Sequence, residues 1–119
     1  MTNPGLETLL DLDGQILVQE DGSWIKIEAR LVNETDHRPH GIKYSLTLHG
    51  REGERLLGYD NAHGLKQKGK KHQAQRVPHD HRHPFEKRQP VPYAFSSPEE
   101  LLEHFFAEVD DVLKELKKR

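Results

Sequence analysis

The 119-residue chain has no cysteine and no apolar run long enough to cross a membrane. Without cysteine there is no disulfide framework and no thiolate metal site, which leaves histidine, aspartate and glutamate as the strong metal ligands. Residues 1–7 also lack the basic start and the apolar middle of a signal peptide. We therefore expect a cytoplasmic protein with no membrane partner.

Hydrophobic residues are few: they make up 33% of the chain, against 32% for charged residues. A chain of this length has the size of one domain, and we expect residues 1–119 to form a single one. Its core must be built from elements that are apolar on one side only. This composition favours a half-exposed sheet with a helix across it.

Two stretches, 25–31 and 42–48, alternate apolar and polar residues with the period of a strand that is covered on one side. Weaker strand patterns occupy residues 15–20 and 54–59. Asp21-Gly22 is a typical two-residue hairpin turn, and residues 50–53 form a longer hairpin loop. The sequence therefore predicts an antiparallel meander of about four strands.

The polar face of this predicted sheet would carry basic and hydroxyl side chains. They are Lys26, Arg30, Lys43, Ser45, Thr47 and His49. An ordinary solvent-facing surface explains such a pattern. A binding floor beside Asp60 explains it as well, because the row is rich in Lys, Arg and His.

Residues 97–118 have the pattern of a long amphipathic helix. Ser97 is the expected N-cap, Pro98 is the first helical residue, and Glu100, three residues after the cap, completes a capping box. An apolar stripe at helical spacing follows: Leu101, Phe105, Val109, Val112 and Leu116. Such a stripe packs on a sheet. The expected fold class is α+β, an antiparallel sheet of about four strands with the C-terminal helix on one face.

Residues 65–92 form a basic, histidine-rich segment. They contain eight Lys or Arg and only two acids, although the whole chain has a net charge of −2. Several prolines and no sustained apolar period predict a long loop, which in a compact domain is either disordered or a binding segment. A localised basic block indicates a phosphate-bearing partner, and a solvated loop is the alternative explanation.

Histidine is abundant, with nine in the chain. His79, His81 and His83 are spaced by two, so an extended backbone would point them to one side and Asp80 and Arg82 to the other. Three kinds of chemistry fit: acid–base cleavage of phosphodiesters, metal binding by neutral imidazoles, and simple phosphate binding. The spacing alone does not choose among them.

Four stretches together resemble the TumE-like toxins of toxin–antitoxin modules. They are Tyr44-Ser45-Leu46-Thr47-Leu48, Leu57-Gly58-Tyr59-Asp60-Asn61-Ala62-His63, Pro78-His79-Asp80-His81-Arg82-His83 and the Ser-Pro-Glu-Glu start of the last helix. The resemblance implies a small cytoplasmic protein that inhibits growth unless an antitoxin neutralises it, often a helix-turn-helix protein. Carried over to this chain, it marks Asp60, Asn61, His63, His79, His81 and His83 as the site.

The function expected from these residues is an endoribonuclease-like toxin acting on RNA. His81 and His63 would be the acid–base pair, and Asp60 or Asp80 would orient one imidazole. Basic residues would bind phosphate: Lys70, Lys71, Arg82, Lys43 and Arg30. His37 and His40 have no neighbours in the sequence that resemble a site, and we expect them to be dispensable.

Two other functions remain open. One is a non-catalytic RNA-binding or regulatory module, and the other is a metal-dependent phosphodiesterase. No cofactor is expected, and a divalent metal enters only in the second of these. A homodimer is a further alternative that the sequence neither supports nor excludes.

Overall fold

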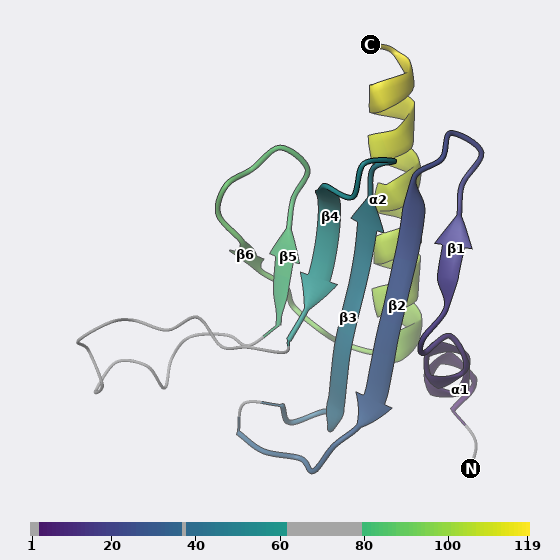
Figure 1. The fold of residues 1–119 in the computed structure, drawn as a ribbon. Coiled ribbons are helices and arrows are strands. Elements are labelled where there is room, and N and C mark those ends of the chain that lie inside the picture. Colours follow the sequence, from purple (N-terminus) through teal and green to yellow (C-terminus); the bar gives the residue numbers. More distant parts are fainter. Residues whose placement is uncertain (1–2, 37, 62–79) are drawn as a thin grey trace.

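The structure is a computed structural model that describes residues 3–36, 38–61 and 80–119. Eight elements follow in order, and Figure 1 shows their arrangement. They are α1 (Pro4–Asp11), β1 (Ile16–Val18), β2 (Trp24–Leu31), β3 (Ile42–His49), β4 (Arg55–Asp60), β5 (His81–His83), β6 (Val91–Pro92) and α2 (Pro98–Lys117). The α+β fold class predicted from the sequence is confirmed.

All strands lie in one antiparallel sheet, and their spatial order is their order in the chain, β1 to β6. The prediction of about four strands was therefore two short. The additional strands β5 and β6 lie within residues 65–92, which the sequence predicted to be a long loop with an extended piece at residues 77–83. They have three and two residues, which is too short for an alternating pattern to be recognised.

The turn between β1 and β2 also differs from the two-residue hairpin predicted at Asp21-Gly22. The amide of Gln19 donates to the carbonyl of Ser23 over 2.7 Å, so residues 20–22 form a three-residue loop. Gly22 has a φ of 90°, the left-handed conformation that such a loop requires near its end. The Asp21 carboxylate accepts hydrogen bonds from the Ser23 amide and hydroxyl, which stabilises the longer turn.

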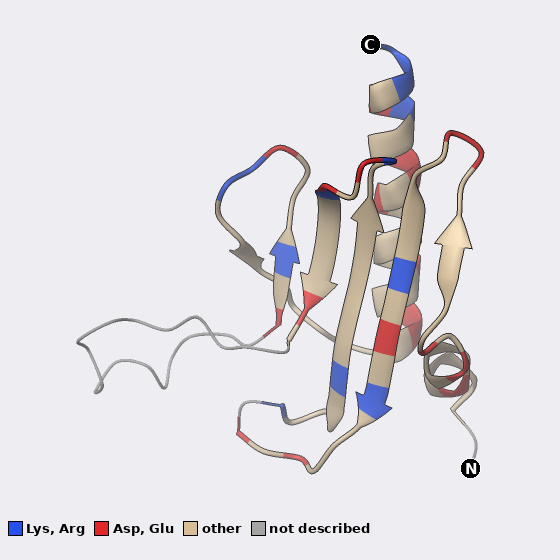
Figure 2. Ribbon diagram, in the orientation of Figure 1, with Lys and Arg blue, Asp and Glu red and all other residues tan. Residues whose placement is uncertain are grey.

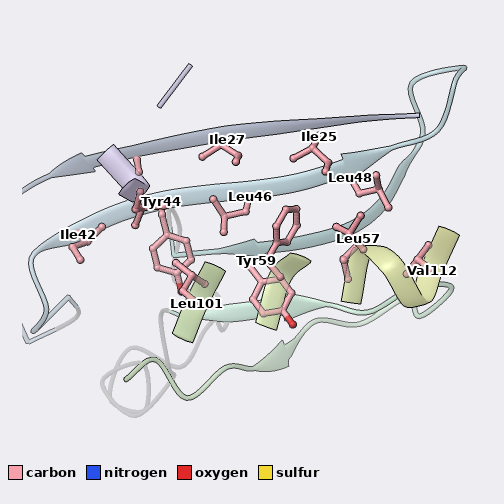
Figure 3. Close-up of a cluster of buried hydrophobic side chains, with 14 residues drawn as sticks. Ile25, Ile27, Ile42, Tyr44, Leu46, Leu48, Leu57, Tyr59, Leu101 and Val112 are labelled. Atoms are coloured by element: carbon pink, nitrogen blue, oxygen red, sulfur yellow. The ribbon is translucent and has the colours of Figure 1, made fainter. Parts of the chain in front are cut away.

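Alternation along the strands sends one set of side chains to the helices and the other set away from them. On the core face, β2, β3 and β4 supply a continuous apolar surface that α2 covers (Figure 3). Its fully buried side chains include Ile27, Tyr44, Leu46, Leu57, Leu101 and Phe105. The first helix adds Leu9 to the same core, and Gly5 lets α1 approach α2 closely, because a Cβ there would lie 2.9 Å from Glu99.

The opposite side, called the open face below, carries the alternate residues of the strands. They are Lys26, Glu28 and Arg30 of β2, Lys43, Ser45 and Thr47 of β3, Asp60 of β4, and His81 and His83 of β5. Figure 1 shows both helices on the other side of the sheet. Neither helix is long and apolar enough to span a bilayer, a finding that covers the described part of the chain.

The N-cap and the first residue of α2 agree with the sequence prediction, whereas the Glu100 carboxylate accepts a hydrogen bond from the Ser96 hydroxyl rather than from the Ser97 amide that a capping box uses. Ser97 is the N-cap, and its hydroxyl accepts the amide hydrogen of Glu100 over 3.1 Å. Pro98 is the first helical residue. The cap fixes the position where α2 begins to cross the sheet.

Candidate functional site

The antiparallel register gathers three titratable residues on the open face, at the end of β4 and the start of β5. Asp60 is the direct cross-strand partner of Ser45 on one side and of His81 on the other. His83 lies two residues further along β5, opposite Gly58. Asp60, His81 and His83 are called the Asp60 cluster below. His81 and His83, which follow Asp60 by 21 and 23 residues in the sequence, are thus brought into contact with it.

The Asp60 carboxylate contacts both imidazoles. Its Oδ1 lies 3.4 Å from Nδ1 of His81, and its Oδ2 lies 3.1 Å from Nε2 of His83. The carboxylate side chain is 20% exposed. Because each oxygen faces a different ring, Asp60 can orient both histidines at once. Of the two carboxylates proposed from the sequence to orient an imidazole, Asp60 is the one in contact with His81.

His81 is buried, with 2% of its surface exposed. Its Nδ1 faces Asp60, whereas its Nε2 has no hydrogen-bond partner among the residues that the structure describes. Leaving a buried polar atom unpaired costs free energy, so such atoms are rare outside functional sites. A histidine held by a carboxylate at Nδ1 and unpaired at Nε2 is arranged to exchange a proton, or to bind a ligand, through Nε2.

His83 is placed differently, since both of its nitrogens have partners. Arg55 Nη2 donates to Nδ1 over 3.2 Å, and Nε2 contacts Asp60. Burial and the Arg55 guanidinium lower the pKa of His83, and the Asp60 carboxylate opposes them only in part. His83 is therefore neutral at neutral pH, and it supports Asp60 rather than offering a free nitrogen to a substrate.

Asn61 was proposed as a site residue, but the structure places it in the interior. It is fully buried, its Oδ1 accepts the Tyr44 amide over 3.0 Å, and its Nδ2 donates to the Ile42 carbonyl over 2.7 Å. Its own carbonyl accepts a hydrogen bond from Arg38 Nε over 3.2 Å. The side chain of Asn61 thus continues the pairing of β4 with β3 where the strand itself ends.

Asp80 forms a second cluster, called the Asp80 cluster below, with His40 and Tyr44. Asp80 Oδ2 accepts from the Tyr44 hydroxyl over 2.7 Å and lies 3.0 Å from His40 Nε2. His40 Nδ1 accepts the Ile42 amide hydrogen over 3.2 Å. His40 was expected to be dispensable because no neighbour in the sequence resembles a site, but the fold brings Asp80 to it from 40 residues away. Burial and the Asp80 carboxylate raise the pKa of Tyr44, so its hydroxyl stays protonated and donates.

Arg82 points to the core face, away from the Asp60 cluster. Its Nη1 lies 2.6 Å from Glu108 Oε2 of α2, and the Tyr59 hydroxyl donates to Oε1 of the same carboxylate over 2.5 Å. This network joins β4 and β5 to α2. The guanidinium that was expected to bind phosphate is thus engaged in a partly buried ion pair on the other side of the sheet.

Arg30 and Lys43 lie on the open face, as the sequence predicted, and are direct cross-strand partners. They line a hollow of about 380 Å³ together with Asp13, Glu28, Ala29, Tyr44 and Ser45. Lys43 is a diagonal neighbour of Asp60, and the Cα atoms of such pairs are about 7–8 Å apart. Figure 2 shows blue segments, which mark Lys or Arg, near the ends of β2 and β3. The hollow therefore places two basic side chains, Arg30 and Lys43, together with two carboxylates, Asp13 and Glu28, beside the Asp60 cluster.

The remaining site predictions, His63, His79, Lys70 and Lys71, lie outside the described residues. Within the described ranges, no three potential ligands from histidine, aspartate and glutamate are grouped closely enough to hold a metal ion. Sequence reasoning missed Arg55 as a partner of His83, and His40 and Tyr44 as partners of Asp80. No local pattern indicates them, because each contact joins strands or loops that are distant in the sequence.

Comparison with known proteins gives one result. Residues 7–113 match the family model described as Toxin TumE. No curated protein and no solved structure matches the chain. The matched segment contains the entire sheet, both clusters and most of α2.

Proposed function

Because the chain belongs to the TumE toxin family, we propose that it is the toxin of a toxin–antitoxin pair and that it cleaves RNA by histidine acid–base chemistry at His81. The observation that supports this activity is the environment of His81. Its Nδ1 faces the Asp60 carboxylate, and its buried Nε2 has no partner among the described residues. An imidazole titrates near neutral pH, which suits it to both removing and returning a proton.

In the proposed reaction, the ribose 2′-hydroxyl attacks the adjacent phosphorus. A base takes the proton from this hydroxyl as the new O–P bond forms, and an acid gives a proton to the 5′-oxygen as the old P–O bond breaks. The products are a 2′,3′-cyclic phosphate and a 5′-hydroxyl. His81 would perform one of these transfers, and Asp60 would stabilise the imidazolium that forms when Nε2 takes up a proton.

The second proton-transfer group proposed from the sequence is His63. It follows Asn61, whose position is fixed by hydrogen bonds to β3. The assignment of His63 stays a prediction, as do phosphate contacts by Lys70 and Lys71. On the described open face, Arg30 and Lys43 are suitably charged to attract the phosphate and to stabilise its additional negative charge during the reaction.

The partners follow from this role. A cognate antitoxin would neutralise the toxin in the cytoplasm, and a helix-turn-helix protein is the type proposed from the resemblance. A homodimer is the alternative assembly. RNA binding would depend steeply on salt, because each phosphate contact by Lys or Arg releases counterions.

The test uses the purified full-length protein and a fluorescent RNA, with a DNA of the same sequence as the substrate control. We expect cleavage of the RNA only, because DNA lacks the attacking hydroxyl. His81→Ala should lower the rate roughly 10²-fold or more and leave RNA binding nearly unchanged. The matched control is His104→Ala, which removes an exposed histidine on α2.

The two alternative functions give different results in the same assay. Loss of cleavage on adding a chelator, with recovery on adding zinc or manganese, would indicate a metal-dependent phosphodiesterase. Growth inhibition that persists in His81→Ala, without cleavage by either protein, would indicate a binding module. Either result would overturn acid–base catalysis at His81.

A further inference from the structure

The β1 edge of the sheet lies far from the Asp60 cluster and has the features of a docking site. β1 begins the sheet, so one side of this strand has no neighbouring strand from the described parts of the chain. Its Ile16 and Val18 side chains are 56% and 73% exposed. The strand has only three residues, but it contains no lysine or proline, two of the features with which proteins block an open edge.

The backbone groups on this edge can be identified from the pairing with β2. Hydrogen-bonded and non-hydrogen-bonded pairs alternate along an antiparallel ladder, and Gln15 and Gln19 both bond toward the β2 side. Leu17 lies two residues from each of them, so its backbone groups also bond toward β2. The amides and carbonyls of Ile16 and Val18 therefore point outward, where an added strand could bond to them.

A hollow of about 470 Å³ lies next to the end of β1. It is lined by Leu113, Leu116 and Lys117 of α2 and by residues of the β1–β2 turn, namely Gln19, Glu20 and Asp21. A strand added to β1 would point alternate side chains to the two faces of the sheet. On the side of the sheet that faces α2, this hollow offers a partly apolar site for one side chain of the added strand.

Charge around the edge indicates what kind of strand fits. Asp11 and Asp13 precede β1, and Glu20 and Asp21 follow it, all with exposed side chains. A second copy of this chain is a poor fit, because antiparallel pairing centred on Leu17 would place Asp13 of each copy opposite Asp21 of the other. Like charges placed directly opposite are destabilising. A segment with basic residues at both ends would instead meet carboxylates at each.

We propose that the β1 edge is the docking site for an extended segment of the antitoxin, with alternating apolar residues in the middle and Lys or Arg at both ends. The segment adds to the sheet as a seventh strand, its backbone bonding to Ile16 and Val18. The choice of an antitoxin as occupant rests on the proposed toxin role. The docking geometry does not depend on RNA cleavage, because β1 is four strand spacings from β5, roughly 19 Å.

The first test measures binding of the full-length protein to a labelled synthetic peptide, Lys-Arg-Thr-Val-Thr-Val-Thr-Lys-Arg. Val18→Pro removes an outward amide and leaves the β1–β2 ladder intact, since proline is tolerated at an edge where the amide faces solvent. We expect this variant to weaken binding at least tenfold. Val18→Thr keeps the amide and should bind like the unchanged protein. Circular dichroism and thermal unfolding check that each variant is folded.

Two controls test the chemistry of the occupant. Replacing the four basic peptide residues by Glu should abolish binding, and Glu20→Lys should weaken the basic peptide about two- to fivefold, as expected for one exposed charge pair. Leu31→Thr removes another exposed apolar side chain, 61% exposed at the end of β2, and should have no effect. Equal binding by Val18→Pro, or equal binding of the acidic peptide, would overturn the proposal.

The second test uses growth. Cells expressing the chain with its cognate antitoxin should grow, and Val18→Pro should remove this protection without reducing toxicity, whereas Val18→Thr should preserve it. Protection that survives Val18→Pro would overturn the docking site. A wrong ribonuclease proposal would give a different result, because His81→Ala would still inhibit growth. The Val18 variants would still show in that case whether the antitoxin binds at β1. A dimer in sedimentation that Val18→Pro dissociates would assign the edge to a second copy instead.

Discussion

Two carboxylates lie at the same end of the sheet, and each binds histidine on a different side of it. Asp60 contacts His81 and His83 on the open face, whereas Asp80 contacts His40 and the Tyr44 hydroxyl on the core side. Both clusters pair a carboxylate with histidine at 3.0 to 3.4 Å, and the Asp80 cluster adds a tyrosine where the Asp60 cluster has a second histidine. They differ in how completely the imidazole nitrogens are paired.

In the Asp80 cluster the histidine is saturated. His40 Nε2 contacts Asp80, Nδ1 accepts the Ile42 amide hydrogen, and the ring packs on Phe95 with centroids 4.0 Å apart. In the Asp60 cluster, His81 Nε2 has no partner among the described residues. A saturated histidine holds the fold together, and a buried histidine with a spare nitrogen is available to a ligand. The difference predicts separate effects for equivalent substitutions.

The largest expected effect is on catalysis, from Asp60→Asn. The carboxamide no longer stabilises a protonated His81, so cleavage should slow roughly 10²-fold or more, with little change in thermal stability. Asp80→Asn is the matched substitution in the other cluster, and we expect it to slow cleavage less than about tenfold. Kinetic assays and thermal unfolding of both variants check this. Equal slowing by the two variants would remove the distinction between the clusters.

The main elements of the fold could be predicted because the residue patterns that specify them lie within each element. Strands β2 and β3 each have eight residues that alternate cleanly, and α2 has a cap and a long apolar stripe. Strand β5 has only three residues, two of them histidines, and β6 includes a proline. Such short elements form because neighbouring strands offer free backbone groups, and that condition cannot be seen in their own residues.

The site was predictable only in part, for a similar reason. Because His81 and His83 are two residues apart, the sequence correctly predicted that they lie on the same side of the sheet. The pairing of Asp60 with His81 depends on the register between β4 and β5. The alternation of residues within each strand does not determine this register when a long connection separates the two strands. Arg55 shows the limit clearly: simple alternation puts it with Leu57 on the core face, but a bulge next to His49 brings it opposite His49, within reach of His83.

An intermediate effect, on stability, is expected from Tyr44→Phe. This substitution removes the hydroxyl that donates to Asp80 over 2.7 Å and leaves the ring in the core. Losing a hydrogen bond to a charged group should lower the free energy of unfolding by about 1.5–3 kcal/mol, measured by urea denaturation. The control is Tyr93→Phe, whose hydroxyl contacts the exposed His104 and should matter less. A shifted pH profile of cleavage in Tyr44→Phe would contradict a purely structural Asp80 cluster.

The smallest expected effect concerns pH and His83. Burial and Arg55 lower the pKa of His83, so between that lowered value and about 6.5 the unfolded chain binds more protons than the folded chain. The free energy of unfolding therefore rises with pH across this window, and the loss begins as pH falls below about 6.5. Protonation would also break the bond that Arg55 donates to Nδ1. His83→Gln should flatten this part of the curve in urea titrations between pH 5 and 7. An unchanged slope in His83→Gln would mean that His83 titrates as it does in the unfolded chain, and Arg55 would then have no part in keeping it neutral beside Asp60.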